Sequence, residues 1–318
     1  MLTSRLVRII VCILNTYQAG TLILNMPRSK VERARKSVEK YFSEIKKTVF
    51  SKTELLNILA SKPPAWGISA LSSLRGFIEF LIKERLLKER KVNAKYMEYP
   101  RYVKPQYSPY ELALSLRPRS YLTHYTAVFI NGLTDQIPRN IYVNKEQGPK
   151  ENVLPNLKQA KIDYAFRRPP RRTTNLASCD DYKIYLLNGM HTGDLGVISV
   201  EGEYGEILKV TNVERTLIDI SVRPFYSGGV FEVLGAFVYA QEKAAVSVTK
   251  ILNYLGRLKF VYPYHQVIGF YLERSNVYEE DLIKPFREMP KEFDFYLTHE
   301  IKEKEYSENW RLYYPRGF

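Results

Sequence analysis

The chain has 318 residues, 45% of them hydrophobic, and a formal net charge of +14 at pH 7. This apolar content excludes general disorder, and no apolar run approaches the roughly 20 residues that a membrane helix needs. The two cysteines, Cys12 and Cys179, form neither a metal-binding spacing nor a disulfide framework, so we expect a reducing, cytoplasmic environment.

Residues 1–25 have an unusual composition. Arg5 and Arg8 precede a short apolar run, Ile9–Leu14, and polar residues follow at once. A signal peptide, an extra helix and a mis-assigned start, with Met26 as the true first residue, all remain open. The apolar run is short for a signal peptide, so we expect residues 1–25 to be a leader or a mis-assigned start.

The positive charge is concentrated near the N-terminus. Residues 26–120 contain 21 Lys and Arg against 9 Asp and Glu, a net charge of +12. Residues 121–318 contain 25 of each and are neutral. A basic segment joined to a neutral one is typical of proteins that bind polyanions, although a basic surface that only aids solubility gives the same asymmetry.

Three helices are predicted in the basic segment. Apolar residues at helical spacing predict the first over Val31–Lys47. Ser51 and Glu54 form a capping box that opens a second helix, which ends before Pro63. A third helix is predicted over Ser69–Arg85. Its expected buried stripe comprises Leu71, Leu74, Ile78, Leu81 and Ile82, and its expected exposed face comprises Ser69, Ser72, Ser73, Gly76, Glu79 and Lys83, with Arg75 on the flank.

A basic hairpin is predicted after the third helix. Leu86–Tyr102 alternates loosely in hydrophobicity, and Asn93-Ala94 is the expected turn. Three helices followed by such a hairpin indicate a winged helix-turn-helix, in which the third helix enters the major groove and the wing contacts backbone phosphates. The same fold is also used for docking to proteins. The predicted DNA-contacting residues are Ser69, Ser72, Ser73, Arg75, Lys83, Lys88, Arg90, Lys91 and Lys95.

The sequence predicts four parts: residues 1–25, a winged-helix domain over 26–104, a linker over 105–120 with a short helix near Tyr110–Leu116, and a larger mixed α/β domain over 121–318. Strands are expected at Ile141–Val143, Lys183–Leu187, Gly196–Val200 and Phe293–Leu297. Helices are expected at Phe231–Ala245, Val246–Leu258 and His265–Arg274. This mixed order indicates an α/β or α+β fold.

Two features of the second domain have a functional and a structural interpretation. Thr211 and Glu214 form a capping box for a helix on which Arg215 and Asp219 lie four residues apart. We favour a salt bridge on the helix surface over an acid/base pair in a site. The loop Arg167-Arg168-Pro169-Pro170-Arg171-Arg172 either contacts a nucleic acid or partner protein, or is a solvated loop.

No catalytic motif stands out. The four histidines, His124, His191, His265 and His299, have no metal-ligand spacing, and no phosphate-binding or dinucleotide-binding glycine motif is present. The nearest approach to a catalytic set is a Mg²⁺-dependent nuclease using Asp294, Glu300 and Lys302, residues that also arise readily by chance in a charged chain. We therefore expect no enzyme activity, no cofactor and no metal.

Several long stretches of the sequence, in the same order along the chain, resemble those of a known family. These stretches are the winged-helix segment, YLTHYTAVFINGLTDQIPRNIYV at Tyr121–Val143, IDYAF at Ile162–Phe166, GDLGV at Gly193–Val197, VTNVERTLIDISVRP at Val210–Pro224 and YPYHQVIGFYLER at Tyr262–Arg274. Over about residues 31–318 the chain resembles the AbiEi antitoxins of type IV toxin–antitoxin (abortive infection) systems. The long connection Ser61–Ile68 and the residues before Met26 depart from that pattern.

The resemblance implies two activities in phage defence. Such antitoxins repress their own operon by binding inverted repeats in promoter DNA through the winged helix. They also antagonise a nucleotidyltransferase toxin, with the C-terminal domain implicated and no stable complex required. The competing hypotheses are a one-component transcription regulator whose second domain binds a small ligand, and the nuclease described above. A nucleotidyltransferase encoded next to this chain would favour the antitoxin.

Overall fold

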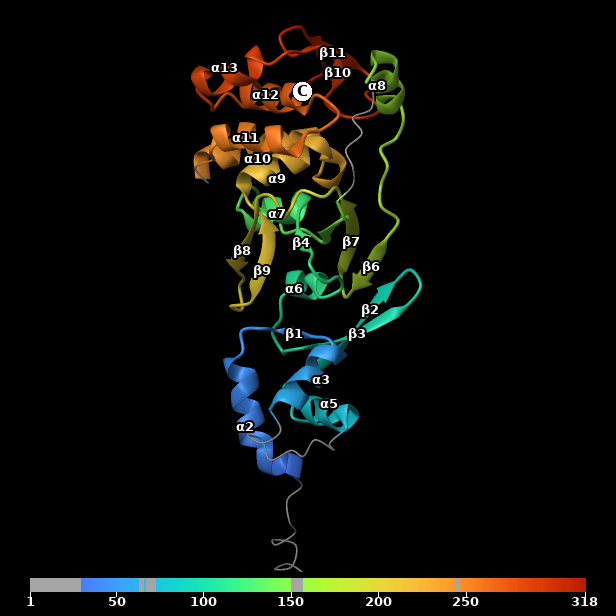
Figure 1. Cartoon of the computed structure of the whole chain (residues 1–318), viewed down its shortest axis with the longest axis vertical. Coiled ribbons are helices and arrows are strands. Elements are labelled where there is room, and N and C mark those ends of the chain that lie inside the picture. Colours follow the sequence, from blue (N-terminus) through green and yellow to red (C-terminus); the bar gives the residue numbers. More distant parts are fainter. Residues whose placement is uncertain (1–29, 63–65, 67–72, 150–156, 244–245) are drawn as a thin grey trace, which may run out of the picture. The chain divides into compact units, whose positions relative to one another are not determined.

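The computed structural model describes residues 30–62, 66, 73–149, 157–243 and 246–318. The chain divides into two compact units (Figure 1). Among the described residues, the first comprises those of 30–45 and 52–87, and the second comprises those of 46–51 and 88–318. The predicted leader, residues 1–25, lies outside the described residues.

The first unit is helical. Its helices are α2 (Lys30–Glu44), α3 (Lys52–Ser61) and α5 (Leu74–Lys83), which occur where the sequence predicts helices. Trp66 lies at the centre of their core, with its ring centroid 5.4 Å from that of Tyr41 and 5.8 Å from that of Phe77.

The buried face of α5 differs from the predicted stripe. Phe77, Phe80 and Leu81 are buried, whereas Ile82 is 38% exposed and Leu74 and Ile78 are only partly buried. The core is aromatic, and the large Phe77 ring contacts Trp66, so the helix turns its phenylalanines inward.

The second unit is built around a nine-stranded mixed sheet with the order β1-β3-β2-β6-β7-β5-β4-β9-β8. Its strands are β1 (Val49–Phe50), β2 (Lys88–Ala94), β3 (Glu98–Val103), β4 (Tyr121–Leu122), β5 (Asn140–Glu146), β6 (Leu176–Cys179), β7 (Tyr182–Gly189), β8 (Val197–Glu201) and β9 (Ile207–Thr211). The pairs β5–β7 and β4–β9 are parallel, and the other pairs are antiparallel. The mixed α and β architecture that the sequence predicts is therefore present.

The predicted hairpin is part of this sheet. Its strands are β2 and β3, and the turn lies at 95–97, two residues beyond the predicted Asn93-Ala94 turn. The end of β2 also pairs with β6, because Asn93 is opposite Ser178 and Ala94 is opposite Ala177. The sequence places the hairpin with the N-terminal helices, whereas backbone pairing joins it to the larger unit.

The predicted linker over 105–120 is instead packed against the sheet. It contains α6 (Pro109–Leu114), whose Leu112 and Ala113 are buried. Glu111 accepts a hydrogen bond from the backbone N–H of Thr48 (2.9 Å), and Arg101 on β3 donates to the hydroxyl of Ser115 (2.8 Å). The proline-rich composition therefore marks a tight connection, and not an extended linker between domains.

A helical layer lies at one end of the strands (Figure 1). Its elements are α7 (His124–Ile130), α8 (Gln159–Phe166), α9 (Val213–Val222), the short 3₁₀ helix η1 (Pro224–Tyr226), α10 (Val230–Lys243), α11 (Val248–Leu258), α12 (Tyr264–Ser275) and α13 (Glu280–Glu288). A second sheet has the order β10-β12-β11, formed by β10 (Phe295–Tyr296), β11 (Lys304–Ser307) and β12 (Leu312–Pro315).

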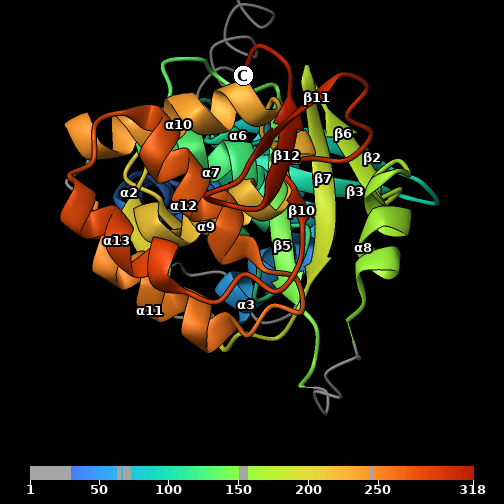
Figure 2. The same ribbon diagram turned by 90° about the horizontal axis from the view of Figure 1, so that it is seen from above.

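The helices and the small sheet share one core. Figure 2 shows β10 and β12 beside α12, and Gln266 of α12 donates a hydrogen bond to the carbonyl of Trp310 (2.7 Å). Gly269 faces the indole of Trp310 so closely that any β-carbon at position 269 would collide with it. Among the described residues, no helix combines the length and the apolar composition needed to cross a bilayer.

Candidate nucleic-acid interface and polar sites

The β2–β3 hairpin presents a basic, exposed surface. Val92 of β2 is fully buried, whereas Lys88, Lys91 and Lys95 are exposed. Tyr96 at the turn is 86% exposed, and Lys95 Nζ lies 5.1 Å from the centroid of its ring. Figure 1 shows this turn projecting away from the rest of the sheet.

The cations of the hairpin differ in their partners. Lys91 Nζ is 3.3 Å from Glu98 Oε1, and Arg90 Nε is 3.6 Å from Asp180 Oδ2. Within the described part of the chain, Lys88 and Lys95 have no carboxylate within 4 Å. Lys88 and Lys95 are thus the hairpin cations best able to bind a phosphate without first breaking an ion pair.

The third helix contributes fewer predicted contact residues. Ser73 is the N-cap of α5, where its hydroxyl accepts a hydrogen bond from the backbone N–H of Gly76 (3.1 Å). Arg75 Nε is 2.9 Å from Glu79 Oε1 on the same exposed face, and Lys83 is exposed in the last turn. Ser69 and Ser72 lie outside the described residues.

The arginine-rich loop after α8 is exposed. Arg167, Arg168, Arg171 and Arg172 are all solvent-accessible, and among the described residues none has a carboxylate within 4 Å. Two of the four guanidinium groups lie over aromatic rings: Arg168 is 3.8 Å from the centroid of Tyr164, and Arg172 is 5.5 Å from that of Phe225.

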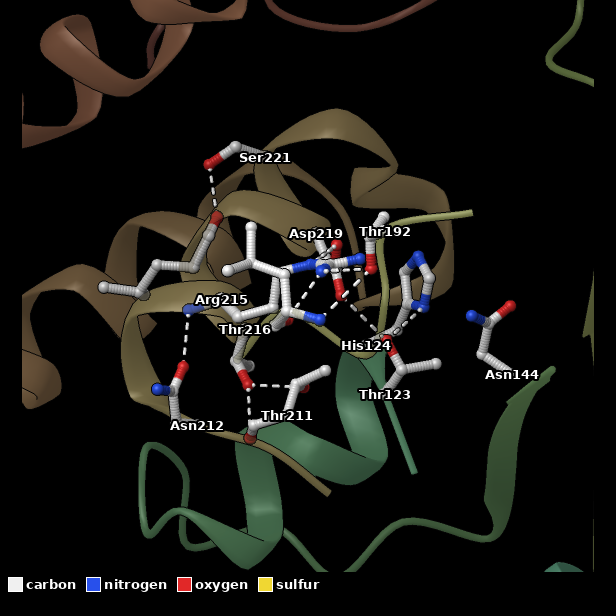
Figure 3. Close-up of polar contacts among 12 residues, drawn as sticks. Thr123, His124, Asn144, Thr192, Thr211, Asn212, Arg215, Thr216, Asp219 and Ser221 are labelled. Atoms are coloured by element: carbon white, nitrogen blue, oxygen red, sulfur yellow. Dashed lines mark hydrogen bonds and ion pairs between the residues drawn. The ribbon is translucent and has the colours of Figure 1, made fainter. Parts of the chain in front are cut away.

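The Arg215–Asp219 pair is buried, so its interpretation as a surface salt bridge is wrong. The side chains of Arg215 and Asp219 are only 6% and 13% exposed, and Nε lies 2.8 Å from Oδ1 (Figure 3). Arg215 also donates to the carbonyl of Leu195 (2.7 Å) and to the Thr192 hydroxyl (3.3 Å). Four-residue spacing is identical on an exposed and a buried helix, so the sequence pattern did not distinguish them.

The start of α9 also differs from the predicted capping box. Asn212, and not Thr211, is the N-cap, and its side chain accepts from the backbone N–H of Arg215 (3.0 Å). The Thr211 hydroxyl lies 2.8 Å from that of Thr216 on α9 (Figure 3). Glu214 pairs with Lys250 of α11 at 3.0 Å and so joins the two helices.

A second carboxylate stabilises the same region. Glu146, at the end of β5, accepts hydrogen bonds from the backbone N–H groups of Thr192 (2.7 Å) and Gly193 (3.0 Å). Burial alone would raise the pKa of Glu146, but hydrogen bonds from Thr192 and Asp194 outweigh it and hold that pKa below its ordinary value. Sequence reasoning missed this residue, because Thr192 and Gly193, which donate to it, are more than forty residues away.

A small cavity of about 60 Å³ adjoins the Arg215–Asp219 pair. Its lining includes Thr123, His124, Asn144 and Arg223. His124 has a left-handed backbone conformation with φ of 51°, and burial lowers the pKa of its side chain to about 3. The imidazole is therefore neutral at physiological pH, and its Nδ1 lies 3.2 Å from the Thr123 hydroxyl (Figure 3).

The proposed nuclease residues are not assembled into one site. Asp294 accepts hydrogen bonds from Arg311 (2.9 Å) and Tyr306 (2.8 Å). Glu300 and Lys302 instead line a pocket to which Asp294 does not contribute.

The four histidines do not assemble a metal site either. His265 and His299 lie near backbone carbonyls, His191 lies 3.5 Å from Glu146, and His124 is buried beside Thr123. The described residues contain no group of three His, Cys, Asp or Glu side chains that could bind a metal ion.

Comparisons with known proteins give a similar fold but no family. No protein-family model matches the chain, and no curated protein matches it. The chain is similar in structure to the Rv2827c protein of Mycobacterium tuberculosis, with a TM-score of 0.53 and 12% sequence identity. The match covers 91% of this chain and 92% of that protein, so the similarity concerns the arrangement of nearly the whole chain.

Proposed function

We propose that this protein is a DNA-binding repressor and type IV antitoxin of the AbiEi kind, acting in the cytoplasm. On this proposal it binds inverted repeats in its own promoter as double-stranded DNA and antagonises a nucleotidyltransferase toxin. The observation that carries the DNA-binding part is the projecting basic hairpin, with Lys88, Lys91 and Lys95 exposed along β2 and its turn.

The hairpin suits contact with the phosphate backbone. Ammonium groups on an exposed strand attract phosphates regardless of sequence, and the +12 charge of residues 26–120 strengthens this attraction. We infer that a winged helix-turn-helix recognises the bases, with α5 as the recognition helix and Arg75, which is exposed and paired with Glu79, as the candidate base-reading residue. Arginine binds guanine bidentately in the major groove, whereas lysine acts as a point charge.

Support for the antitoxin part comes from the sequence resemblance. Two of the resembling stretches, Tyr121–Val143 and Val210–Pro224, include β4, α7, most of β5 and α9, and they contain most of the polar residues labelled in Figure 3, among them Thr123, Arg215 and Asp219. The residues of these stretches therefore belong largely to the core of the second unit. We expect the surface that antagonises the toxin to lie outside these stretches.

The first experiment measures DNA binding by the full chain. Binding to the DNA upstream of its gene is measured at several salt concentrations. If about five cations contact phosphates, the logarithm of affinity should fall against the logarithm of salt concentration with a slope of about −4 to −5. A salt-independent affinity, or equal affinity for all duplexes, would exclude an operator-binding repressor.

The second experiment tests the antitoxin activity. A nucleotidyltransferase encoded next to this chain is expressed with and without the full chain, and growth is followed. Restored growth is expected even when the two proteins do not co-purify. Failure to restore growth, with promoter binding intact, would favour the one-component regulator.

The alternative function is a regulator that responds to a small ligand. The cavity beside Arg215 and Asp219 favours it, because Arg223 lines this cavity without a carboxylate partner among the described residues. At about 60 Å³ the cavity accommodates only a few waters or a small anion.

A further inference from the structure

Two segments far apart in sequence are held together at the C-terminal end of α8. The backbone N–H of Glu300 donates to the carbonyl of Phe166 (2.8 Å), and His299 Nδ1 lies 3.0 Å from the carbonyl oxygen of Arg168. The rings of Phe166 and His299 stack with centroids 4.4 Å apart. These contacts fix the start of the arginine-rich loop against the segment that leads into β11.

This junction brings together cations that the sequence separates by more than 130 residues. A pocket of about 290 Å³ is lined by Arg167 from the α8 end and by Lys302 and Lys304 from the C-terminal segment, with Glu300 as its single carboxylate. Phe166 and Tyr296, both largely buried, form the aromatic part of its wall, with their rings stacked on each other at a centroid distance of 5.5 Å. We call these five side chains and Glu300 the α8 pocket.

The cations of the α8 pocket are not neutralised by neighbouring acids. Within the described residues, Arg167, Lys302 and Lys304 have no carboxylate within 4 Å. Nearby Arg316, by contrast, is 3.2 Å from Glu303 and 3.9 Å from Glu305. Uncompensated like charges repel one another, and an anionic ligand removes that repulsion.

The exposed arginines of the loop extend this charge beyond the pocket. Arg171 and Arg172 follow Pro169-Pro170, which restrict the backbone and favour an extended course. Arg168 lies over the ring of Tyr164, which is itself 59% exposed. A line of cations beside an exposed aromatic ring is the combination by which proteins hold unpaired nucleotides.

We propose that the α8 pocket and the arginine-rich loop bind a single-stranded polynucleotide. Arg167, Lys302 and Lys304 contact its phosphates, and one nucleotide enters the pocket. A duplex keeps its bases stacked inside and presents a convex backbone, whereas a concave cationic pocket close to the exposed ring of Tyr164 suits an unstacked nucleotide. An acidic peptide would use the cations but gain little from the exposed ring of Tyr164. This site is independent of the DNA-binding hairpin and goes beyond the proposed function.

The test measures binding of fluorescein-labelled 12-nucleotide oligo(U) and oligo(dT) to the full chain by fluorescence anisotropy at low salt. We expect the variant Arg167→Ala/Lys302→Ala/Lys304→Ala to bind at least tenfold more weakly. The slope of the logarithm of affinity against the logarithm of salt concentration should become shallower by about 2, since about 0.7 counterions are released per phosphate neutralised on a single strand. A preference between oligo(U) and oligo(dT) identifies RNA or DNA as the natural strand.

Two controls separate this site from charge in general and from the hairpin. Arg316→Ala removes a cation that is also exposed but already paired, and the affinity of this variant should stay within twofold of the wild type. Lys91→Ala/Lys95→Ala should weaken binding of promoter duplex but not of oligo(U). If the triple variant unfolds, Lys302→Gln/Lys304→Gln, which changes only exposed side chains, replaces it and should bind at least fivefold more weakly.

Several results would overturn the proposal. These are no binding of either oligonucleotide by the wild type, an equal loss in Arg316→Ala, or a loss of duplex binding as large as the loss of single-strand binding in the pocket variant. Equal affinity for a 12-residue poly-Glu peptide, lost in the same variant, would assign the site to an acidic protein. Failure of promoter binding with intact oligonucleotide binding would affect only the hairpin proposal.

Discussion

Lys91 on β2 and Glu98 on β3 form an ion pair across the hairpin, with Nζ 3.3 Å from Oε1. Both side chains are largely exposed, so the pair adds little to stability. The effect of Glu98 is electrostatic. It pairs with Lys91, which we propose binds phosphate, and it places a negative charge beside the backbone of a bound duplex.

Removing that carboxylate should strengthen DNA binding. We expect Glu98→Gln to raise the affinity for promoter duplex about threefold to tenfold, and the salt dependence to steepen by about 1, because Lys91 becomes available to one more phosphate. Anisotropy titrations over a series of salt concentrations check both values. Weaker binding by Glu98→Gln would show that the hairpin does not face DNA.

The hairpin and the third helix should give different mutational results. Lys91→Ala/Lys95→Ala should reduce affinity about tenfold for operator and random duplexes alike, because phosphates carry no direct base information. Arg75→Ala should narrow the difference between operator and random DNA by about 1–3 kcal/mol. Competition titrations with both duplexes measure these effects. Loss of discrimination in the hairpin variant, with non-specific affinity retained, would mean that the hairpin reads bases.

The buried pair on α9 should be structural. Asp219→Ala leaves the Arg215 guanidinium buried without its carboxylate, and we expect the free energy of unfolding to fall by about 3–5 kcal/mol. Urea denaturation followed by circular dichroism measures it. The matched control is Glu288→Ala, which breaks the exposed Lys284–Glu288 pair and should cost no more than about 0.5 kcal/mol. Similar losses in both variants would contradict a structural role for the Arg215–Asp219 pair.

His124 should make the fold sensitive to acid. Because burial lowers its pKa to about 3 in the folded protein, the unfolded chain binds a proton that the folded chain does not, between about pH 6.5 and pH 3. Stability should therefore fall as the pH falls through this window, by up to about 1.4 kcal/mol per pH unit from this residue.

The variant His124→Asn tests that assignment. Asn tolerates the left-handed backbone at position 124 and does not titrate in this window. The variant should lose less stability than the wild type between pH 6.5 and pH 4, as measured by thermal unfolding at several pH values. If the variant and the wild type lost the same stability over this pH range, groups other than His124 would be responsible for the acid sensitivity.

Local sequence patterns predicted the long elements of this fold well. The helical spacing of apolar residues predicted α10, α11 and α12. Short runs of aliphatic and aromatic residues predicted β5 and β7. These elements depend on residues a few positions apart, which a pattern can record. On α5 the burial of Leu81 was predicted, but the burial of Phe77 and Phe80 was not, because Phe77 contacts the ring of Trp66, a residue outside the helix.

Features that depend on distant residues could not be predicted. The pairing of β2 with β6 joins Asn93 to Ser178, and neither strand carries a mark of its partner. The same holds for the α8 pocket, whose cations come from two segments of the second unit that are more than 130 residues apart. The arginine-rich loop was recognised from its composition, but Lys304 was not, because an isolated lysine near the C-terminus is unremarkable until the chain folds.

The pairing of β2 with β6 has a consequence for the entropy of DNA binding. A wing that projects alone loses conformational freedom when it closes on a phosphate backbone, and that loss reduces the affinity of each contact. In this chain the end of β2, at Asn93 and Ala94, is held by β6 as well as by β3. The hairpin has therefore lost that conformational freedom already on folding. Its lysines lie on a pre-organised strand, so less conformational entropy is lost when they bind a duplex.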